Sequence, residues 1–238
     1  MRKFARRPDK DRMDLFRETA RMMGIHAAIV EKDFWVCWML DYLFHISPFA
    51  ELLVFKGGTS LSKAYGAISR FSEDIDLILD WRSLGYSTYE PWRVVSATKR
   101  DALSREANAK AGDFLTDRFL PVLAEDIGRF IGRSASVSIA GQEVIFSYPR
   151  AFALAAIIPQ IKLEIGPLAA WKPNEERRIC CFAAEHFPVF FEKSHISVRT
   201  TSAERTFWEK VTILHQEAHR GQNKALPARF SRHYYDLY

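Results

Sequence analysis

Hydrophobic positions along the chain recur with two different periods, and each period predicts its own kind of element. Residues 11–23 and 29–44 carry apolar side chains at helical spacing, so both segments are predicted to be helices. The second of them, "IVEKDFWVCWMLDYLF", is so rich in Trp, Phe and Leu that it is expected to be largely buried. Charged and apolar faces alternate again over residues 92–132, which predicts a helical segment with Gly112 and Pro121 as candidate breaks.

Short apolar runs bounded by turn residues predict strands in the middle of the chain. The expected elements are the strand in "ELLVFKGG" (51–58), the helix "TSLSKAYGAI" (59–68), the strand "DIDLIL" (74–79), the hairpin "SVSIAGQEVIFSYP" (136–149), and the strands "IPQIKLEIG" (158–166) and "RRICCFA" (177–183). This mixture predicts an α+β fold with a small mixed sheet and flanking helices. The expected regions are a helical N-terminal region (1–50), a core (51–200) and a helical C-terminal region (201–238).

The last predicted helix, "TTSAERTFWEKVTILHQEAHRG", has recognisable start and stop signals. A capping box beginning at Thr201 fits its start, and Gly221 supplies its stop. Its apolar stripe comprises Phe207, Trp208, Val211, Leu214 and Ala218. The stripe is expected to turn Trp208 and Val211 inward, which places Lys210 at its edge.

Composition changes this picture only a little. The chain has 238 residues, of which 48% are hydrophobic and 26% charged, and these values are typical of a globular protein. The three cysteines do not indicate a disulfide framework. No apolar run has the length of a signal peptide or a membrane span, so a cytoplasmic protein without a membrane partner is expected. The net charge of +5 permits a polyanionic partner such as nucleic acid without requiring one.

Candidate chemistry gathers in "FKGGTSLSKAYGAISRFSEDIDLIL", which covers residues 55–79. Asp74 and Asp76 lie two apart in a predicted strand, so they face the same way with backbone positions about 6–7 Å apart. Carboxylates held this close raise each other's pKa or bind a cation, most simply Mg²⁺ shared with substrate phosphates. An isolated pair of this kind more often points into water, so its neighbours decide between the two interpretations.

The neighbours upstream are two glycines and two hydroxyl residues. Gly57 and Gly58 separate a predicted strand from a predicted helix, and their backbone would allow a ligand to approach closely. Thr59 and Ser60 can cap that helix, whose N-terminal amides attract an anion. Two glycines alone indicate only a turn, but together with the aspartates they predict a site for a metal-bound nucleoside triphosphate.

A phosphoryl-transfer site with two metal ions needs a third carboxylate. Glu164 is the best candidate because it is a charge in the middle of an apolar predicted strand. Lys162 precedes it by two residues and therefore shares its face. The alternative interpretation is a surface Lys–Glu pair on a half-exposed strand, and Leu163 and Ile165 face the core in either case.

Several of these segments resemble the AbiEii/AbiGii-type nucleotidyltransferases, the toxin components of bacterial abortive-infection toxin–antitoxin systems. The resemblance is carried by "FKGGTSLSKAYGAISRFSEDIDL", the "EKD-W" pattern of the second helix, "IKLEIG", the "EK" pair of the late helix, and "RHYYDLY". It implies a polymerase-β-like nucleotidyltransferase core with helical accessory regions. It also implies further helical sequence after "RHYYDLY", so the C-terminal region is either that of a compact member or truncated.

The resemblance assigns roles by position. It implies that Gly58 and Ser60 hold a triphosphate and that Lys210 contacts the nucleotide phosphates. The catalytic candidates are Asp74, Asp76, Glu164 and Lys210, and the three acidic residues among them are the expected ligands of Mg²⁺ or Mn²⁺. The nucleotide-binding candidates are Lys56, Gly57, Gly58, Thr59, Ser60, Lys63, Arg70, Ser72 and Lys162.

The expected activity is Mg²⁺-dependent transfer of a nucleoside monophosphate from an NTP to an RNA acceptor, with release of pyrophosphate. The resemblance implies tRNA as the acceptor and a cognate antitoxin as a partner. Two rivals stay open: a nucleotidyltransferase that modifies proteins, and an inert module that binds nucleotide or antitoxin. The joint presence of three carboxylates and a lysine argues against the inert module.

Overall fold

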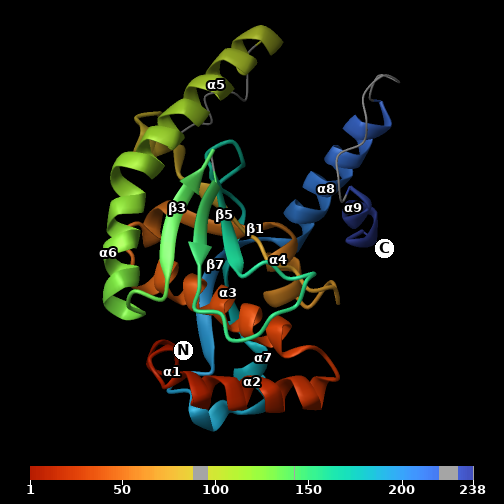
Figure 1. Cartoon of the computed structure of the whole chain (residues 1–238). Helices are drawn as coiled ribbons and strands as arrows, with labels where there is room; N and C mark the ends of the chain where they lie inside the picture. The colour runs from red at the N-terminus through yellow and green to blue at the C-terminus, as the bar shows by residue number, and fades with distance from the viewer. Residues whose placement is uncertain (88–95, 142, 220–229, 238) are drawn as a thin grey trace.

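The structure of the protein is a computed structural model that describes residues 1–87, 96–141, 143–219 and 230–237. A sheet lies at its centre with helices around it (Figure 1). The strands are β1 (Leu53–Lys56), β2 (Ile75–Leu79), β3 (Ser136–Ala140), β4 (Glu143–Ser147), β5 (Gln160–Gly166), β6 (Asn174–Cys180) and β7 (His195–Thr201). The α-helices are α1 (Arg2–Ala5), α2 (Asp9–Met23), α3 (Ala27–His45), α4 (Gly57–Lys63), α5 (Ala97–Phe114), α6 (Leu120–Phe130), α7 (Phe182–His186), α8 (Ala203–Ala218) and α9 (Ser231–Tyr235).

The sheet is mixed, as expected from the sequence. Within the described residues it contains seven strands in the order β3-β4-β5-β2-β1-β7-β6. β2 pairs in parallel with β5 and β1 pairs in parallel with β7, whereas all other neighbours are antiparallel. The predicted hairpin forms β3 and β4. The α+β fold with a mixed sheet and flanking helices is therefore confirmed, and the sheet is wider than the small one expected.

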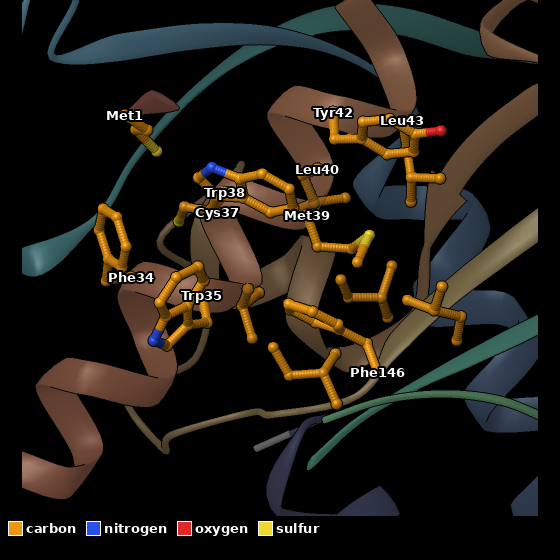
Figure 2. Close-up of a cluster of buried hydrophobic side chains, with 14 of the residues drawn as sticks. Met1, Phe34, Trp35, Cys37, Trp38, Met39, Leu40, Tyr42, Leu43 and Phe146 are labelled. Carbon is orange, nitrogen blue, oxygen red and sulfur yellow. The ribbon is translucent and has the colours of Figure 1, made fainter. Parts of the chain in front are cut away.

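α3 supplies the centre of the hydrophobic core. Every residue from position 30 to position 43 is buried, which confirms the expectation for this apolar segment. Trp35 and Trp38 lie against Phe146 of β4, at ring-centroid distances of 6.2 Å and 6.0 Å (Figure 2). Burying each aromatic side chain of this kind contributes about 1.5–3 kcal/mol to stability. The packing holds one face of the sheet against α3.

Two predicted helices have other boundaries than expected. α4 begins at Gly57 rather than Thr59 and already ends at Lys63. Gly112 does not interrupt α5, which passes through the π-helical turn η3 (Leu115–Phe119) into α6. Pro121 lies near the start of α6 and cannot donate to the carbonyl four residues earlier, and the π-helical turn absorbs that missing bond. Residues 92–95 of the predicted helical segment lie outside the described residues.

The later strands also differ in extent from the predictions. The predicted strand 177–183 is β6, which begins at Asn174 and ends at Cys180, where α7 follows. β7 has no predicted counterpart. Its buried Ile196 and Val198 alternate with the exposed His195 and Ser197, so a period-two signal was present in the sequence.

α8 turns a different face inward than its apolar stripe predicts. Its N-cap is Ser202, whose side chain accepts a hydrogen bond from the Arg205 amide, so the capping box predicted from Thr201 is wrong. Its buried residues are Thr206 and Lys210, whereas Trp208 is 62% exposed. In Figure 1, α8 extends away from the sheet beside α9.

Three further expectations concern the end of α8, membrane spans and the division of the chain into regions. The predicted stop at Gly221 lies outside the described residues. None of the described helices is long and apolar enough to span a membrane. The core cluster contains residues from both the N-terminal helices and the sheet, and the division at residues 50 and 200 remains a prediction.

Candidate active site

The parallel pairing of β2 with β5 brings two predicted site residues together. Asp76 is the cross-strand partner of Glu164, and Lys56 of β1 is the partner of Asp76 on the other side. Directly opposed residues share a face of a sheet, so these three side chains form a row across three strands. Ile75 and Leu77 alternate with Asp76 and are buried in the core. The row therefore lies on the face opposite the core.

A pocket of about 260 Å³ lies over this face. Its lining includes nine of the predicted site residues, namely Lys56, Gly57, Gly58, Arg70, Ser72, Asp74, Asp76, Glu164 and Lys210. These residues come from β1, β2, β5, α4, α8 and the segment before β2. The structure thus gathers the glycine turn, the three carboxylates and the lysine around one hollow.

Other side chains occupy the space beside both glycines, and at Gly57 they leave no room for a side chain. Gly57 has a φ of +82°, and a Cβ at this position would lie 1.9 Å from Oδ2 of Asp76. A Cβ at Gly58 would lie 2.8 Å from Nη2 of Arg70 and 3.3 Å from Oγ of Ser72. Only glycine adopts such a φ readily, and only glycine leaves room for this carboxylate. The turn therefore makes space for the site's own side chains.

The two hydroxyl residues after the glycines fasten the turn from behind. Thr59 Oγ1 lies 2.5 Å from the carbonyl oxygen of Asp74 and 2.8 Å from Oγ of Ser72. Ser60 Oγ donates to the carbonyl of Gly57 over 2.8 Å. Both residues are buried, and neither lines the pocket or caps α4, whose N-cap is Lys56. In this structure they hold the segment before β2 against the glycine turn.

Lys210 and Arg70 share a partner that the sequence interpretation missed. Asp236, at the end of α9, lies 2.7 Å from Nζ of Lys210 and accepts hydrogen bonds of 2.6 Å and 2.7 Å from Arg70. Burial works to raise the pKa of Asp236, but the hydrogen bonds from Arg70 and Lys210 outweigh it and lower that pKa. The carboxylate is therefore charged, and it holds both cations at the pocket.

Arg232, the first residue of the "RHYYDLY" segment, is a second residue that the sequence interpretation missed. It lines the pocket and two adjoining hollows, and among the described residues it makes no ion pair. Lys56 also faces the pocket, with its Nζ 3.8 Å from Glu209. The sequence offered one signal for Arg232, which is that it lies in a segment resembling the family. The spacing of the neighbouring residues gave no indication of a functional role.

The carboxylates carry more negative charge than their surroundings balance. Burial, with the nearby charges of Glu164 and Asp74, raises the pKa of Asp76 to about 7. Burial and the adjacent Glu73 also raise the pKa of Asp74. Carboxylate oxygens are the ligands that Mg²⁺ and Mn²⁺ prefer, and a cation would relieve this repulsion, so the donor set fits a divalent ion. In the described part of the chain no three acidic, His or Cys side chains already converge as a metal centre.

Two predicted nucleotide-binding residues lie elsewhere. Lys63 is buried in an ion pair with Asp33 of α3 and also donates to the carbonyl of Cys180 over 3.1 Å, so it faces the core and not the pocket. Lys162 pairs with Glu143 of β4 over 2.8 Å at the half-exposed edge of the site. It lines a neighbouring hollow that also contains Asp74 and Glu164.

Comparison with known proteins gives one informative match. The family described as "Nucleotidyl transferase AbiEii toxin, Type IV TA system" matches residues 40–238. No curated protein matches the chain. Among solved structures, MenT4, a nucleotidyltransferase toxin from Mycobacterium tuberculosis H37Rv, matches with 16% sequence identity and a TM-score of 0.45.

The MenT4 match covers 87% of this chain and 65% of that one, so the chain spans less than two thirds of the length of that structure. A likeness this distant carries no weight in assigning the site. The family match stands by itself and extends over most of the sequence, including every candidate site residue. The protein therefore belongs to the family of AbiEii nucleotidyl transferase toxins of type IV toxin–antitoxin systems.

Proposed function

We propose that the protein is a nucleotidyltransferase that moves a nucleoside monophosphate from an NTP onto a hydroxyl of an RNA acceptor, with tRNA as the expected acceptor. We further propose that it acts in this way as a toxin and that a cognate antitoxin binds it. The observation that carries the proposal is a single pocket whose lining combines the three predicted carboxylates with four cationic side chains. Family membership supports the same reaction class.

The cationic side of the pocket suits a triphosphate. Its members are Lys56, Arg70, Lys210 and Arg232. Asp236 balances only one of the charges of Arg70 and Lys210, so this side keeps a surplus of positive charge. Side chains held in fixed positions at a pocket wall stabilise developing negative charge without reorganising during the reaction. Lys210 and Arg70 are therefore proposed to hold the phosphates that leave as pyrophosphate.

The acidic side suits a divalent cation. Asp74, Asp76 and Glu164 would hold Mg²⁺ or Mn²⁺, which when bound supplies charge neutralisation and lowers the pKa of the attacking hydroxyl. In the ion-free protein, Asp76 must lose its proton before it can act as a ligand, because its pKa is about 7. Lys56 beside Asp76 favours that deprotonated state.

The covalent step needs only the NTP and the acceptor hydroxyl as reactants. A bond forms between the acceptor oxygen and the α-phosphorus, and the bond from that phosphorus to the bridging oxygen breaks, so pyrophosphate departs. The hydroxyl proton passes to one of the three carboxylates, Asp74, Asp76 or Glu164. A second hollow of about 370 Å³ adjoins the pocket and shares Lys56, Asp76 and Glu164 with it, which leaves room for a second substrate.

A screen of substrates tests this proposal. The purified protein is incubated with Mg²⁺, each of the four α-labelled NTPs, and either purified tRNA, total RNA or a cell lysate. RNase-sensitive label that requires Asp76 is the expected result. RNase-resistant label on protein would show that the acceptor is a protein side chain. Triphosphate binding without any transfer or pyrophosphate release would favour the inert module.

A further inference from the structure

α3 contains three consecutive charged residues that are almost completely buried. Glu31, Lys32 and Asp33 have exposed fractions of 1%, 2% and 0%. Charged side chains are almost never buried this deeply unless they are paired. Successive residues of a helix point about 100° apart, so each of the three reaches a different part of the molecule.

Two of the three fasten loops of the scaffold. Glu31 accepts hydrogen bonds from the amides of Ala151 and Phe152, over 2.7 Å and 3.1 Å. Asp33 accepts from the amide of Phe182 over 2.7 Å and pairs with Lys63. Neither Glu31 nor Asp33 lines any hollow that contains the candidate carboxylates.

Lys32 reaches the site itself. Its Nζ lies 2.5 Å from Oε2 of Glu73 and donates to the carbonyl of Ile158 over 2.9 Å. Glu73 directly precedes Asp74, and Ile158 comes two residues before β5, the strand that carries Glu164. One ammonium group thus ties together the two backbone segments that lead into the acidic strands.

Lys32 also lines a hollow of about 220 Å³ together with Asp74 and Glu164. We propose that Lys32 is a positioning residue, whose bridge between Glu73 and the Ile158 carbonyl holds in place the two segments that lead to Asp74 and Glu164, two of the proposed ligands of one divalent cation. Its part in catalysis rests on the proposed function, whereas its part in cation binding does not. Groups that support metal ligands typically change metal affinity or activity about 10–100-fold when they are removed.

The test compares Mn²⁺ binding by wild type, Lys32→Met and Glu31→Gln, measured from the electron paramagnetic resonance signal of free Mn²⁺. Lys32→Met is expected to weaken Mn²⁺ binding about 10–100-fold. Simple electrostatics predicts the opposite, because removing a positive charge near the carboxylates would tighten binding of a cation. Glu31→Gln is the matched control, since it is equally buried on the same helix, and it is expected to lower the melting temperature without changing Mn²⁺ affinity.

Kinetics supply a second measurement. Lys32→Met is expected to lower kcat about 10–100-fold while KM for the NTP changes little, because Lys32 does not line the pocket that contains Arg70 and Lys210, the residues proposed to hold the phosphates. Lys32→Gln, which keeps hydrogen-bonding groups at this position, should show a smaller loss in the same direction, and it replaces Lys32→Met if the latter does not fold.

The outcomes separate the two proposals. Equal or tighter Mn²⁺ binding by the Lys32 variants overturns the positioning role, as does wild-type protein that binds no Mn²⁺. If wild type binds Mn²⁺ but transfers nucleotide to no acceptor, the proposed function fails, and the comparison of Mn²⁺ affinities still decides the role of Lys32.

Discussion

Two buried lysines, one in the scaffold and one at the pocket, look alike by exposure and differ in what surrounds them. Lys63 pairs with Asp33 at side-chain exposures of 7% and 0%, and Lys210 pairs with Asp236 at 8% and 0%. Both lysines therefore meet a fully buried carboxylate. Burial alone does not separate a structural ion pair from a functional one.

The difference lies in the balance of charge and in the access to a hollow. Lys63 and Asp33 match one to one, and Lys63 also donates to the Cys180 carbonyl and lies over the ring of Phe182. Asp236 instead faces Lys210 and Arg70 together, and both cations line the pocket. A surplus of charge next to an open hollow is what a charged substrate can use.

The largest expected effect comes from the acidic side of the pocket. Asp76→Asn should lower nucleotide transfer about 10³-fold, because a preorganised charge in the reaction centre is lost. Its melting temperature should not fall, since the substitution also removes repulsion from Glu164 and Asp74. Asp33→Asn serves as the control, and it should lose thermal stability while retaining transfer. Full transfer by Asp76→Asn in a labelled-NTP assay would refute the assignment of the acidic side.

Substitution of the two lysines by methionine separates the two regions directly. Lys63→Met leaves Asp33 buried without its counter-charge and should cost about 3–5 kcal/mol of unfolding free energy. Lys210→Met should cost less, because Arg70 still balances Asp236, while triphosphate affinity falls at least tenfold. Urea unfolding and calorimetric titration with a triphosphate measure the two quantities. An equal loss of stability in both variants would show that the two ion pairs contribute equally to folding, which contradicts the proposed difference between them.

A substitution in the glycine turn tests whether the pocket tolerates a change of shape. Gly57→Ala places a methyl group where Oδ2 of Asp76 lies, at a φ of +82° that alanine rarely adopts. Displacement of that carboxylate by about 1 Å should lower kcat about 10²-fold. Gly24→Ala is the control for the backbone term alone, since Gly24 has a φ of +65° and nothing within 4 Å of an added Cβ. If both variants lose only stability, the contact between Gly57 and Asp76 has no catalytic role.

The pH dependence of stability should show the unbalanced carboxylate without any substrate. Burial and Glu164 raise the pKa of Asp76 from 3.8 to about 7, so between these values the folded protein binds more protons than the unfolded chain. Stability therefore falls as pH rises through this window, and the unfavourable contribution is complete above pH 7. Melting temperatures of ion-free wild type should drop from pH 5 to pH 8 more than those of Asp76→Asn. If the melting temperatures of the two proteins change with pH in parallel, the pKa of Asp76 is not raised in the folded protein.

The smallest expected effect is on the outer face of α8. Trp208 is 62% exposed, so Trp208→Ala should change the free energy of unfolding by less than about 0.5 kcal/mol. The sequence pattern instead predicts a core tryptophan, whose loss would cost about 3–5 kcal/mol. Urea unfolding of this one variant distinguishes the two orientations of the helix.

Local periodicity was a good guide where a strand has one buried face. Lys162 and Glu164 alternate with buried Leu163 and Ile165 as expected, because side chains along a strand alternate between faces. The same rule sets Asp76 beside Glu164 only after β2 pairs with β5, and a pattern within one strand does not specify its neighbour. The pattern within each strand therefore predicts that Asp76 and Glu164 lie on the face opposite the core, but it does not predict that the two residues are direct cross-strand partners.

The cationic side of the pocket was largely beyond prediction from sequence. Asp236 and Arg70 meet across 166 positions of the chain, and no spacing rule covers such a distance. Lys63 flanks the glycines in sequence, yet the turn of α4 carries its side chain into the core. On α8 the hydrogen bond between Thr206 and Thr201 and the pairing of Lys210 with Asp236 select the inward face, and the apolar stripe does not.

The most direct test is the diffraction structure of the protein crystallised with Mn²⁺ and a non-hydrolysable NTP analogue, with the ion located by its anomalous signal. The predicted result is an anomalous peak bound by Asp74, Asp76 and Glu164, with the triphosphate extending past Gly58 to Lys210. An ion held elsewhere, or a triphosphate bound with Glu164 turned away from the aspartates, would contradict the proposed site.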